Sequence, residues 1–139
     1  MLRNRALKEE SFGAAITLLN AALHACGQAL QLFPTDATHW LAKTHRAIGT
    51  IYQVGRRFSQ SLFHYLKAVC YEEATGDFYS AARNLYNVAV MLAYDNGHYD
   101  DALLYAEAAL QKFQMCGYQD TDMIQNTQEL LKEIRQLEA

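Results

Sequence analysis

The chain has 139 residues, of which 51% are hydrophobic and 19% charged, and it carries a net charge of −3. This composition is typical of a single folded domain and excludes an intrinsically disordered chain. The acidic balance excludes the strongly basic surface that general nucleic-acid binding requires. No apolar run reaches roughly 18 residues, the length that crosses a bilayer, and the letters MLRNRALKEESF lack the apolar core of a signal peptide. We therefore expect a cytoplasmic protein that binds neither membranes nor nucleic acid.

Helices dominate the pattern of apolar residues. Proline, which interrupts helices, occurs only at Pro34. Its scarcity and the three- and four-residue steps between apolar positions predict an all-α fold. In chain order we expect helices at Leu2–Lys8, Ser11–Phe33, Ala37–Val54, Phe58–Thr75, Tyr79–Asn96, Tyr99–Cys116 and Asp120–Leu137.

Three of these helices repeat one pattern. An aromatic residue is followed by a small residue three positions later and by another ten positions later, and the residue at seven positions lies on the same helix face. The sets are Phe12, Ala15, Leu19, Ala22; Phe58, Ser61, Tyr65, Ala68; and Tyr99, Ala102, Ala106, Ala109. These steps place all four side chains on one helix face. Because small side chains let a neighbouring helix approach closely, we expect Ala68 and Ala109 to be buried against one.

Two of the three patterns follow a helix with a small residue near its centre, Gly49 in one and Ala89 in the other. Glycine costs about 1 kcal/mol relative to alanine inside a helix, so Gly49 predicts a point where two backbones come close. Gly55 and Gly97 fit the left-handed residue that ends a helix, and Gly76 stands where a helix should stop. The second unit carries one extra residue before Gly97.

Acidic residues stand where several helices should begin. Asp36 and Asp77 are candidates for N-terminal caps or first-turn acids, and Asp100 and Asp101 for first-turn acids that stabilise the helix dipole. The last predicted helix has one apolar and one polar face, which predicts a helix that shields the end of a stack. Its apolar face comprises Met123, Ile124, Thr127, Leu130, Leu131, Ile134 and Leu137.

Two segments combine these features: GTIYQVGRRFSQSLFHYLKA, which starts at Gly49, and YNVAVMLAYDNGHYDDALLYAEAAL, which starts at Tyr86. They resemble tetratricopeptide repeats, of the longer type found in large bacterial signalling proteins. The resemblance implies an α-α superhelix, a right-handed α-solenoid of antiparallel helix pairs with a C-terminal capping helix. The single domain, 1–139, then comprises a partial repeat at 1–35, repeats at 36–76 and 77–117, and the capping helix at 120–138.

In this family the first helix of each pair lines a concave surface that binds a peptide or protein segment. The resemblance therefore implies an interaction scaffold that is not an enzyme and needs no cofactor. Asn87 matches a position where family members present an asparagine to a peptide backbone, since an amide both donates and accepts. The equivalent position in the preceding repeat is Ala47. The implied partner-binding residues are Lys43, Arg46, Thr50, Gln53, Arg83, Tyr86, Asn87, Val90 and Tyr94.

Charge is unevenly distributed along the chain. Residues 1–70 hold eight Lys/Arg and three Asp/Glu, whereas residues 71–139 hold four and twelve. The cations Lys43, Arg46 and Arg83 suit an acidic segment or a C-terminal carboxylate as the partner. Because the first repeat lacks a complete first helix, the open N-terminal end could also pair with a second copy to form a homodimer.

Catalytic chemistry has no local signature in the sequence, which contains no GxSxG, glycine-rich phosphate loop or HExxH motif. One alternative is a metal-dependent helical-bundle enzyme, which requires histidines and cysteines from separate helices to converge. Another is a regulatory C-terminal segment of a larger signalling ATPase or transcription regulator. The histidines and cysteines are His24, His39, His45, His64, His98, Cys26, Cys70 and Cys116.

Overall fold

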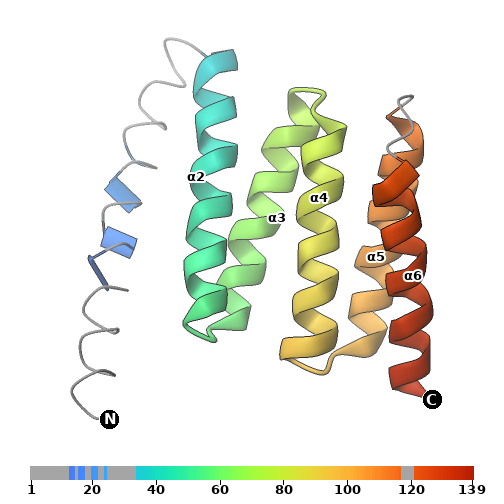
Figure 1. Cartoon of the computed structure of the whole chain (residues 1–139). Helices are drawn as coiled ribbons and strands as arrows, with labels where there is room; N and C mark the ends of the chain where they lie inside the picture. The colour runs from blue at the N-terminus through green and yellow to red at the C-terminus, as the bar shows by residue number, and fades with distance from the viewer. Residues whose placement is uncertain (1–12, 15, 18–19, 22–23, 25–33, 117–120) are drawn as a thin grey trace, which may run out of the picture.

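The computed structural model of the chain describes residues 34–116 and 121–139, together with residues 13, 14, 16, 17, 20, 21 and 24. These residues form helices and turns, with no strand among them, so the described part is all-α as predicted. None of its helices combines the length and the apolar character needed to cross a bilayer. Figure 1 shows the elements in order: α2 Pro34–Val54, α3 Phe58–Ala74, α4 Phe78–Val90, the π-helical segment η1 Met91–Asp95, α5 Tyr99–Met115 and α6 Thr121–Glu138.

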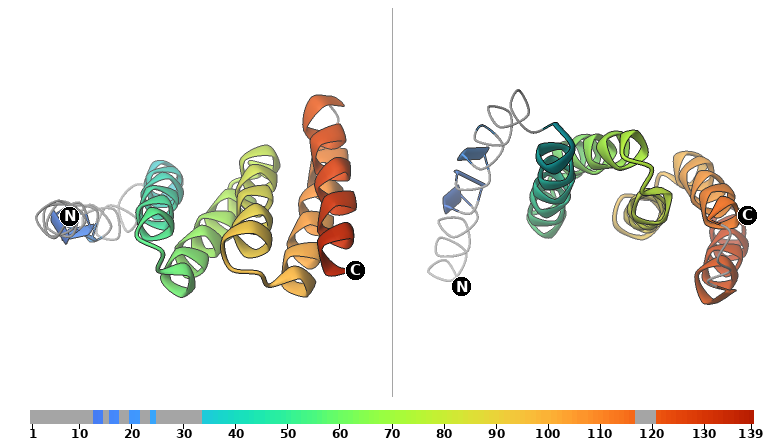
Figure 2. Two further views of the ribbon diagram at one scale, coloured as in Figure 1. Left: turned by 60° about the horizontal axis from the view of Figure 1, so that its bottom comes forward. Right: turned by 90° about the horizontal axis from the view of Figure 1, so that it is seen from above.

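Consecutive helices run in opposite directions, and each packs against the next (Figure 1). The most extensive contacts join α2 to α3 and α4 to α5. Seen from above, α2, α4 and α6 lie on one side of the stack, and α3 and α5 lie on the other (Figure 2). Three parallel helices therefore share one side of the molecule, which we call the α2/α4/α6 face.

The helices predicted from Ala37 onward are confirmed, with ends that differ by a few residues. α2 starts earlier than predicted, at Pro34. Proline is favoured in the first helical turn because its φ is already helical and its missing N–H would have no helical partner there. The predicted helix at Leu2–Lys8 lies outside the described residues, as does most of Ser11–Phe33 with its copy of the repeat pattern.

In the two copies of the repeat pattern that the structure describes, the small residues are buried, as predicted for Ala68 and Ala109. Those without exposed surface are Ser61, Ala68, Ala102, Ala106 and Ala109. At Gly49 a Cβ would lie 3.1 Å from two ring carbons of Tyr65 and 3.3 Å from the Ser61 carbonyl oxygen. The Ser61 hydroxyl donates to the Gly49 carbonyl oxygen at 2.7 Å. The missing side chain at position 49 therefore allows α2 and α3 to approach closely.

Each of the three turns that the structure describes between helices contains a residue with positive φ. Gly76 and Gly97 have φ of 79° and 68°, where glycine has no steric penalty. The prediction for Gly55 is wrong, because the left-handed residue of that turn is Arg56, with φ 59°. The Gly55 N–H still donates to the Ile51 carbonyl at 3.0 Å, so the helical hydrogen-bond pattern continues one residue further than predicted.

Replacing Arg56 with glycine is expected to raise the free energy of unfolding by about 1 kcal/mol, measured by urea denaturation. A left-handed residue other than glycine costs about 1–2 kcal/mol, and the greater freedom of glycine in the unfolded chain offsets part of the gain. Arg56→Ala is the matched control, because it removes the guanidinium that lies 5.4 Å from the Phe58 ring centroid but keeps the backbone strain. An equal gain in both variants would assign the effect to charge instead.

The extra residue of the second unit coincides with the π-helical segment Met91–Asp95. A π turn accommodates one inserted residue without breaking the helix. The Asn96 N–H donates to the Met91 carbonyl at 3.2 Å, across five residues instead of four. The first three residues of the segment are buried, whereas Tyr94 and Asp95 are exposed. The wide turn therefore keeps α4 in the core and presents two polar side chains at its end.

Helix ends follow the predicted acidic residues. The Asp77 carboxylate accepts a hydrogen bond from the Ser80 N–H at 3.1 Å and caps α4. Asp100 and Asp101 lie in the first turn of α5, and Asp36 is the third residue of α2. These positions agree with the expected stabilisation of the helix dipole.

α6 covers the end of the described stack with its apolar face. The buried residues of this face are Thr127, Leu130, Leu131 and Ile134. Three of them join a core cluster with residues of α4, η1 and α5, and the opposite face is polar and exposed. Leu137, at the end of this face, is 45% exposed.

Candidate functional site

The nine predicted partner-binding residues all lie on α2, α4 or η1. Six are exposed and three half-buried; the half-buried ones are Gln53, Tyr86 and Val90. The structure gathers seven of the nine into three groups: a recess beside α2, a hydrogen-bond network around Tyr65, and a cavity between α4 and α6. The remaining two, Arg83 and Asn87, are exposed on α4, with the Arg83 guanidinium 6.0 Å from the Tyr79 ring centroid.

Lys43 and Arg46 line a recess of about 40 Å³ between α2 and the turn that joins α3 to α4. Glu72 and Asp77 contribute the carboxylates of the same recess. The Lys43 ammonium also lies 5.3 Å from the centroid of the Trp40 ring. The cations that were predicted to receive an acidic partner therefore already face carboxylates of the chain itself.

Glu72 is a buried carboxyl group in this recess, 6% exposed. Burial raises the pKa of Glu72 to about 7, an effect that the Asn84 hydrogen bond opposes, the Asp77 charge reinforces and the Arg46 charge opposes. Asn84 is buried too, and its amide Nδ2–H donates to Glu72 Oε1. The sequence did not indicate this pair, since the two residues come from different helices.

A hydrogen-bond network joins Tyr65 of α3 to α2 and continues from Gln53 of α2 to η1. The Tyr65 hydroxyl donates to Gln53 Oε1 at 2.8 Å, and Thr50 Oγ1 lies 3.0 Å from the same hydroxyl. Gln53 Nε2 in turn donates to Asp95 Oδ2 at 3.2 Å. Thr50 and Gln53 are therefore held in place by contacts that also join neighbouring helices.

The third group forms the wall of a cavity of about 260 Å³ between α4 and α6. Tyr86, Val90 and Tyr94 follow one another at four-residue steps on the α4 side. The α6 side is lined by Asn126, Glu129, Leu130 and Glu133. The structure thus brings three predicted residues together with four that the sequence did not assign to a site.

Hydrogen bonding and burial raise the pKa values of both tyrosines of this cavity above the ordinary value. The Tyr94 hydroxyl donates to Glu133 Oε2, and this hydrogen bond is the main reason why the pKa of Tyr94 rises to about 12. Burial raises the pKa of Tyr86, and the charges of Glu133 and Glu129 raise it further. Two neutral aromatic rings therefore face two carboxylates across the cavity.

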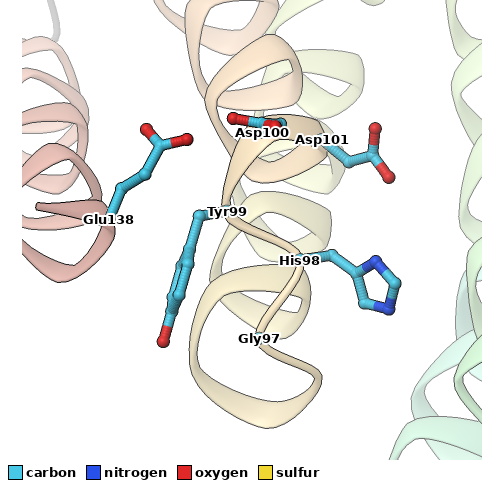
Figure 3. Close-up of a pocket in the computed structure, with 6 residues that line it drawn as sticks. All are labelled: Gly97, His98, Tyr99, Asp100, Asp101 and Glu138. Carbon is cyan, nitrogen blue, oxygen red and sulfur yellow. The ribbon is translucent and has the colours of Figure 1, made fainter.

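A more open recess of about 360 Å³ lies between the start of α5 and the end of α6. In Figure 3 the Glu138 carboxylate is directed toward Asp100, while the side chains of His98 and Asp101 point away from it. The hydrogen bond with Asp100 raises the pKa of Glu138. Across the part of the chain that the structure describes, no group of three or more His, Cys, Asp or Glu side chains is arranged to hold a metal ion.

Two histidines from separate helices meet between α2 and α3, with the Nδ1 atoms of His45 and His64 2.9 Å apart. The rings belong to a column Tyr71–His45–His64–Tyr52 with centroid separations of 5.7, 5.2 and 5.6 Å. Burial lowers the pKa of His45 to about 4, with contributions from His64 and Lys67, and burial also lowers the pKa of His64. The pair is therefore neutral at physiological pH and packs the two helices together.

No family model, curated protein or solved structure matches the chain. The likeness to tetratricopeptide repeats therefore rests on the residues of the chain alone. The cavity between α4 and α6, and the face to which it belongs, are the features that indicate a function.

Proposed function

We propose that the chain is a scaffold that binds a peptide or protein segment along the α2/α4/α6 face. The cavity between α4 and α6 carries this proposal, because two tyrosine rings and two apolar side chains line it beside polar and acidic ones. Tyrosine offers apolar area and a polar tip for little loss of conformational entropy, which suits a hydrated recognition surface. The Tyr94 side chain is 50% exposed, so much of its ring is available for contact.

The finer architecture that we propose is a right-handed α-solenoid of the tetratricopeptide type. Its two helix pairs are α2 with α3 and α4 with α5, and α6 serves as the capping helix in the place of a third pair's first helix. The antiparallel order of the helices and the burial of Ala68 and Ala109 at their crossings support this arrangement. The α2/α4/α6 face is then the concave surface, and a preformed surface pays little ordering entropy when a segment binds.

The charge of the proposed surface changes along its length. Lys43 and Arg46 on α2 suit an acidic part of a bound segment, although Glu72 and Asp77 offset some of this attraction. At the other end the surface is acidic, with carboxylates on α6. The proposed homodimer through the N-terminal end involves residues 1–33, nearly all of which lie outside the described part of the chain.

Peptides selected from a random display library against the whole chain test this proposal. We expect them to bind with a micromolar Kd and to shift the amide NMR signals of α4 and α6. Tyr94→Ala should weaken binding about ten-fold, since it removes an exposed aromatic wall of the cavity. Asn87→Ala should weaken binding about three-fold, because it removes one neutral hydrogen-bonding group.

Leu104→Ala is the matched control for these variants. Leu104 is a large apolar residue on α5, 65% exposed, on the other side of the stack. The variant should bind the selected peptides within about two-fold of the unmodified chain, as expected for a surface substitution away from the site. The proposal is wrong if Leu104→Ala weakens binding as much as Tyr94→Ala, or if the NMR changes lie on α3 and α5.

A further inference from the structure

We propose that the cavity between α4 and α6 is a subsite for one basic side chain, arginine or lysine, of the bound segment. This inference rests on the proposed function and names the chemistry of the partner at one place on the α2/α4/α6 face. Three features of the cavity carry it: two tyrosine rings, two carboxylates and an apolar floor.

The tyrosine rings supply electron-rich faces beside the cavity. A guanidinium or ammonium group within about 6 Å of such a ring is attracted to it, and the attraction is stronger where water is excluded. Tyr86 and Tyr94 both line the cavity, and Tyr94 is 50% exposed. Both rings are neutral phenols, as their raised pKa values require.

The carboxylates Glu129 and Glu133 stand four residues apart on α6 and line the same cavity wall. Two like charges at this spacing repel each other and destabilise an isolated helix. The salt bridges within the described residues are Lys112–Glu73 and Arg135–Glu107, so neither carboxylate is paired with a lysine or arginine there. An incoming cation would remove this repulsion and form charge-assisted hydrogen bonds.

The Tyr94 hydroxyl orients the carboxylate that the cation would meet. Its hydrogen bond to Glu133 Oε2 occupies one oxygen and leaves Oε1 for a donor from the ligand. Val90 and Leu130 form the apolar floor beneath. Arginine and lysine have long aliphatic stems that pack on such surfaces while the charged head contacts polar groups. The cavity volume of about 260 Å³ admits a side chain of this kind and excludes a folded domain.

A capped pentapeptide with arginine at its centre and glycine elsewhere tests the subsite, with the citrulline peptide as its neutral isostere. Two-dimensional NMR of the whole chain follows the amide signals of α4, η1 and α6 at millimolar peptide concentration. We expect saturable shifts around Tyr94 and Glu133 with the arginine peptide, and a Kd at least about five-fold weaker with citrulline. The lysine peptide should bind like the arginine peptide, although less tightly, because its ammonium lacks the planar fork.

Variants separate the subsite from general attraction to an acidic chain. The double substitution Glu129→Gln/Glu133→Gln should weaken binding of the arginine peptide at least about five-fold. Tyr94→Ala should weaken it about three-fold or more. Glu107→Gln removes a carboxylate on α5 and should change the Kd by less than about two-fold. Thermal melting of each variant verifies that it is folded.

The result that overturns the inference is equal binding of the arginine and citrulline peptides, or equal loss in the Glu107→Gln and Glu129→Gln/Glu133→Gln variants. If the selected library peptides still bind the α2/α4/α6 face in that case, the proposed function holds and only the cationic subsite is wrong. Binding of the arginine peptide elsewhere on the chain, with no shifts in α4 and α6, would also overturn it.

Discussion

Gly49→Val is expected to lower the free energy of unfolding by about 3 kcal/mol or more, measured by urea denaturation. A bare Cβ at this position would already lie 3.1 Å from Cγ and Cδ1 of Tyr65, and 3.3 Å from the Ser61 carbonyl oxygen. Two further methyl groups cannot be accommodated unless α2 and α3 separate. The helix propensity gained on replacing glycine is less than about 1 kcal/mol and is too small to offset this overpacking.

The obstruction at Gly49 cannot be relieved by a simple side-chain rotation. Tyr65 is 2% exposed, and its hydroxyl is held by Gln53 at 2.8 Å and by Thr50 at 3.0 Å. Moving the ring would break these contacts and weaken the connection from Gln53 to η1. The Ser61 oxygen belongs to the α3 backbone, so it moves only with the helix.

Two comparison variants separate the close approach from a general effect of enlarging a helix residue. The free energy of unfolding of Gly49→Ala should lie between those of the unmodified chain and Gly49→Val. The alanine Cβ makes tight contacts, but alanine also has a better helix propensity than glycine. Gln60→Leu enlarges the apolar surface at an exposed position of α3 and should change stability by less than about 0.5 kcal/mol. A loss below about 1 kcal/mol in Gly49→Val would show that α2 and α3 are not in close contact there.

The sequence predicted the helix pairs because their chemistry is local and periodic. Small residues recur at three- and four-residue steps, so Ala68 and Ala109 could be assigned to helix crossings, where both are buried. The extra residue before Gly97 was also visible as a change of repeat length. Its absorption into the π turn Met91–Asp95 was not predictable, because the choice between a longer loop and a wider helical turn depends on core packing.

The site was predictable only where its residues share one helix. The resemblance to tetratricopeptide repeats implied that Tyr86 and Tyr94 share one surface, and both line the cavity between α4 and α6. The sequence did not show that Glu129 and Glu133 lie opposite these tyrosines, because that depends on how α6 packs against α4. The contact between His45 and His64 was missed for the same reason, because it depends on how α2 lies against α3.

Glu72→Gln is expected to raise the free energy of unfolding by about 2 kcal/mol at about pH 8, and to leave it almost unchanged at about pH 4.5. Burial raises the pKa of this carboxyl from 4.5 to about 7, so the folded chain holds its proton more tightly than the unfolded chain. The stability that Glu72 contributes is therefore complete below pH 4.5 and is lost as the pH rises through about 7. Glutamine has no proton to lose and can still accept the hydrogen bond from Asn84.

Urea denaturation at a series of pH values measures this effect as the difference between the variant and the unmodified chain at each pH. Taking the difference cancels the titration of the groups that do not interact with Glu72. Asn84→Ala provides the matched comparison, because the Asn84 hydrogen bond lowers the pKa of Glu72 and its removal should enlarge the loss at high pH. In the Glu72→Gln background the effect of Asn84→Ala should not vary with pH. A pH-independent difference between Glu72→Gln and the unmodified chain would contradict the prediction.

His45→Phe completes the comparison, because the titration of His45 acts in the opposite direction. Burial lowers the pKa of His45 from 6.5 to about 4, so its contribution to stability is present above pH 6.5 and is lost as the pH falls through about 4. The two windows overlap between pH 4.5 and 6.5, where the contributions of Glu72 and His45 have opposite slopes. Stability should therefore rise more steeply with pH in Glu72→Gln than in the unmodified chain, and less steeply in His45→Phe. The pH dependence of stability that His45 produces at the contact of α2 with α3 is thus offset by the one that Glu72 produces at the contact of α3 with α4.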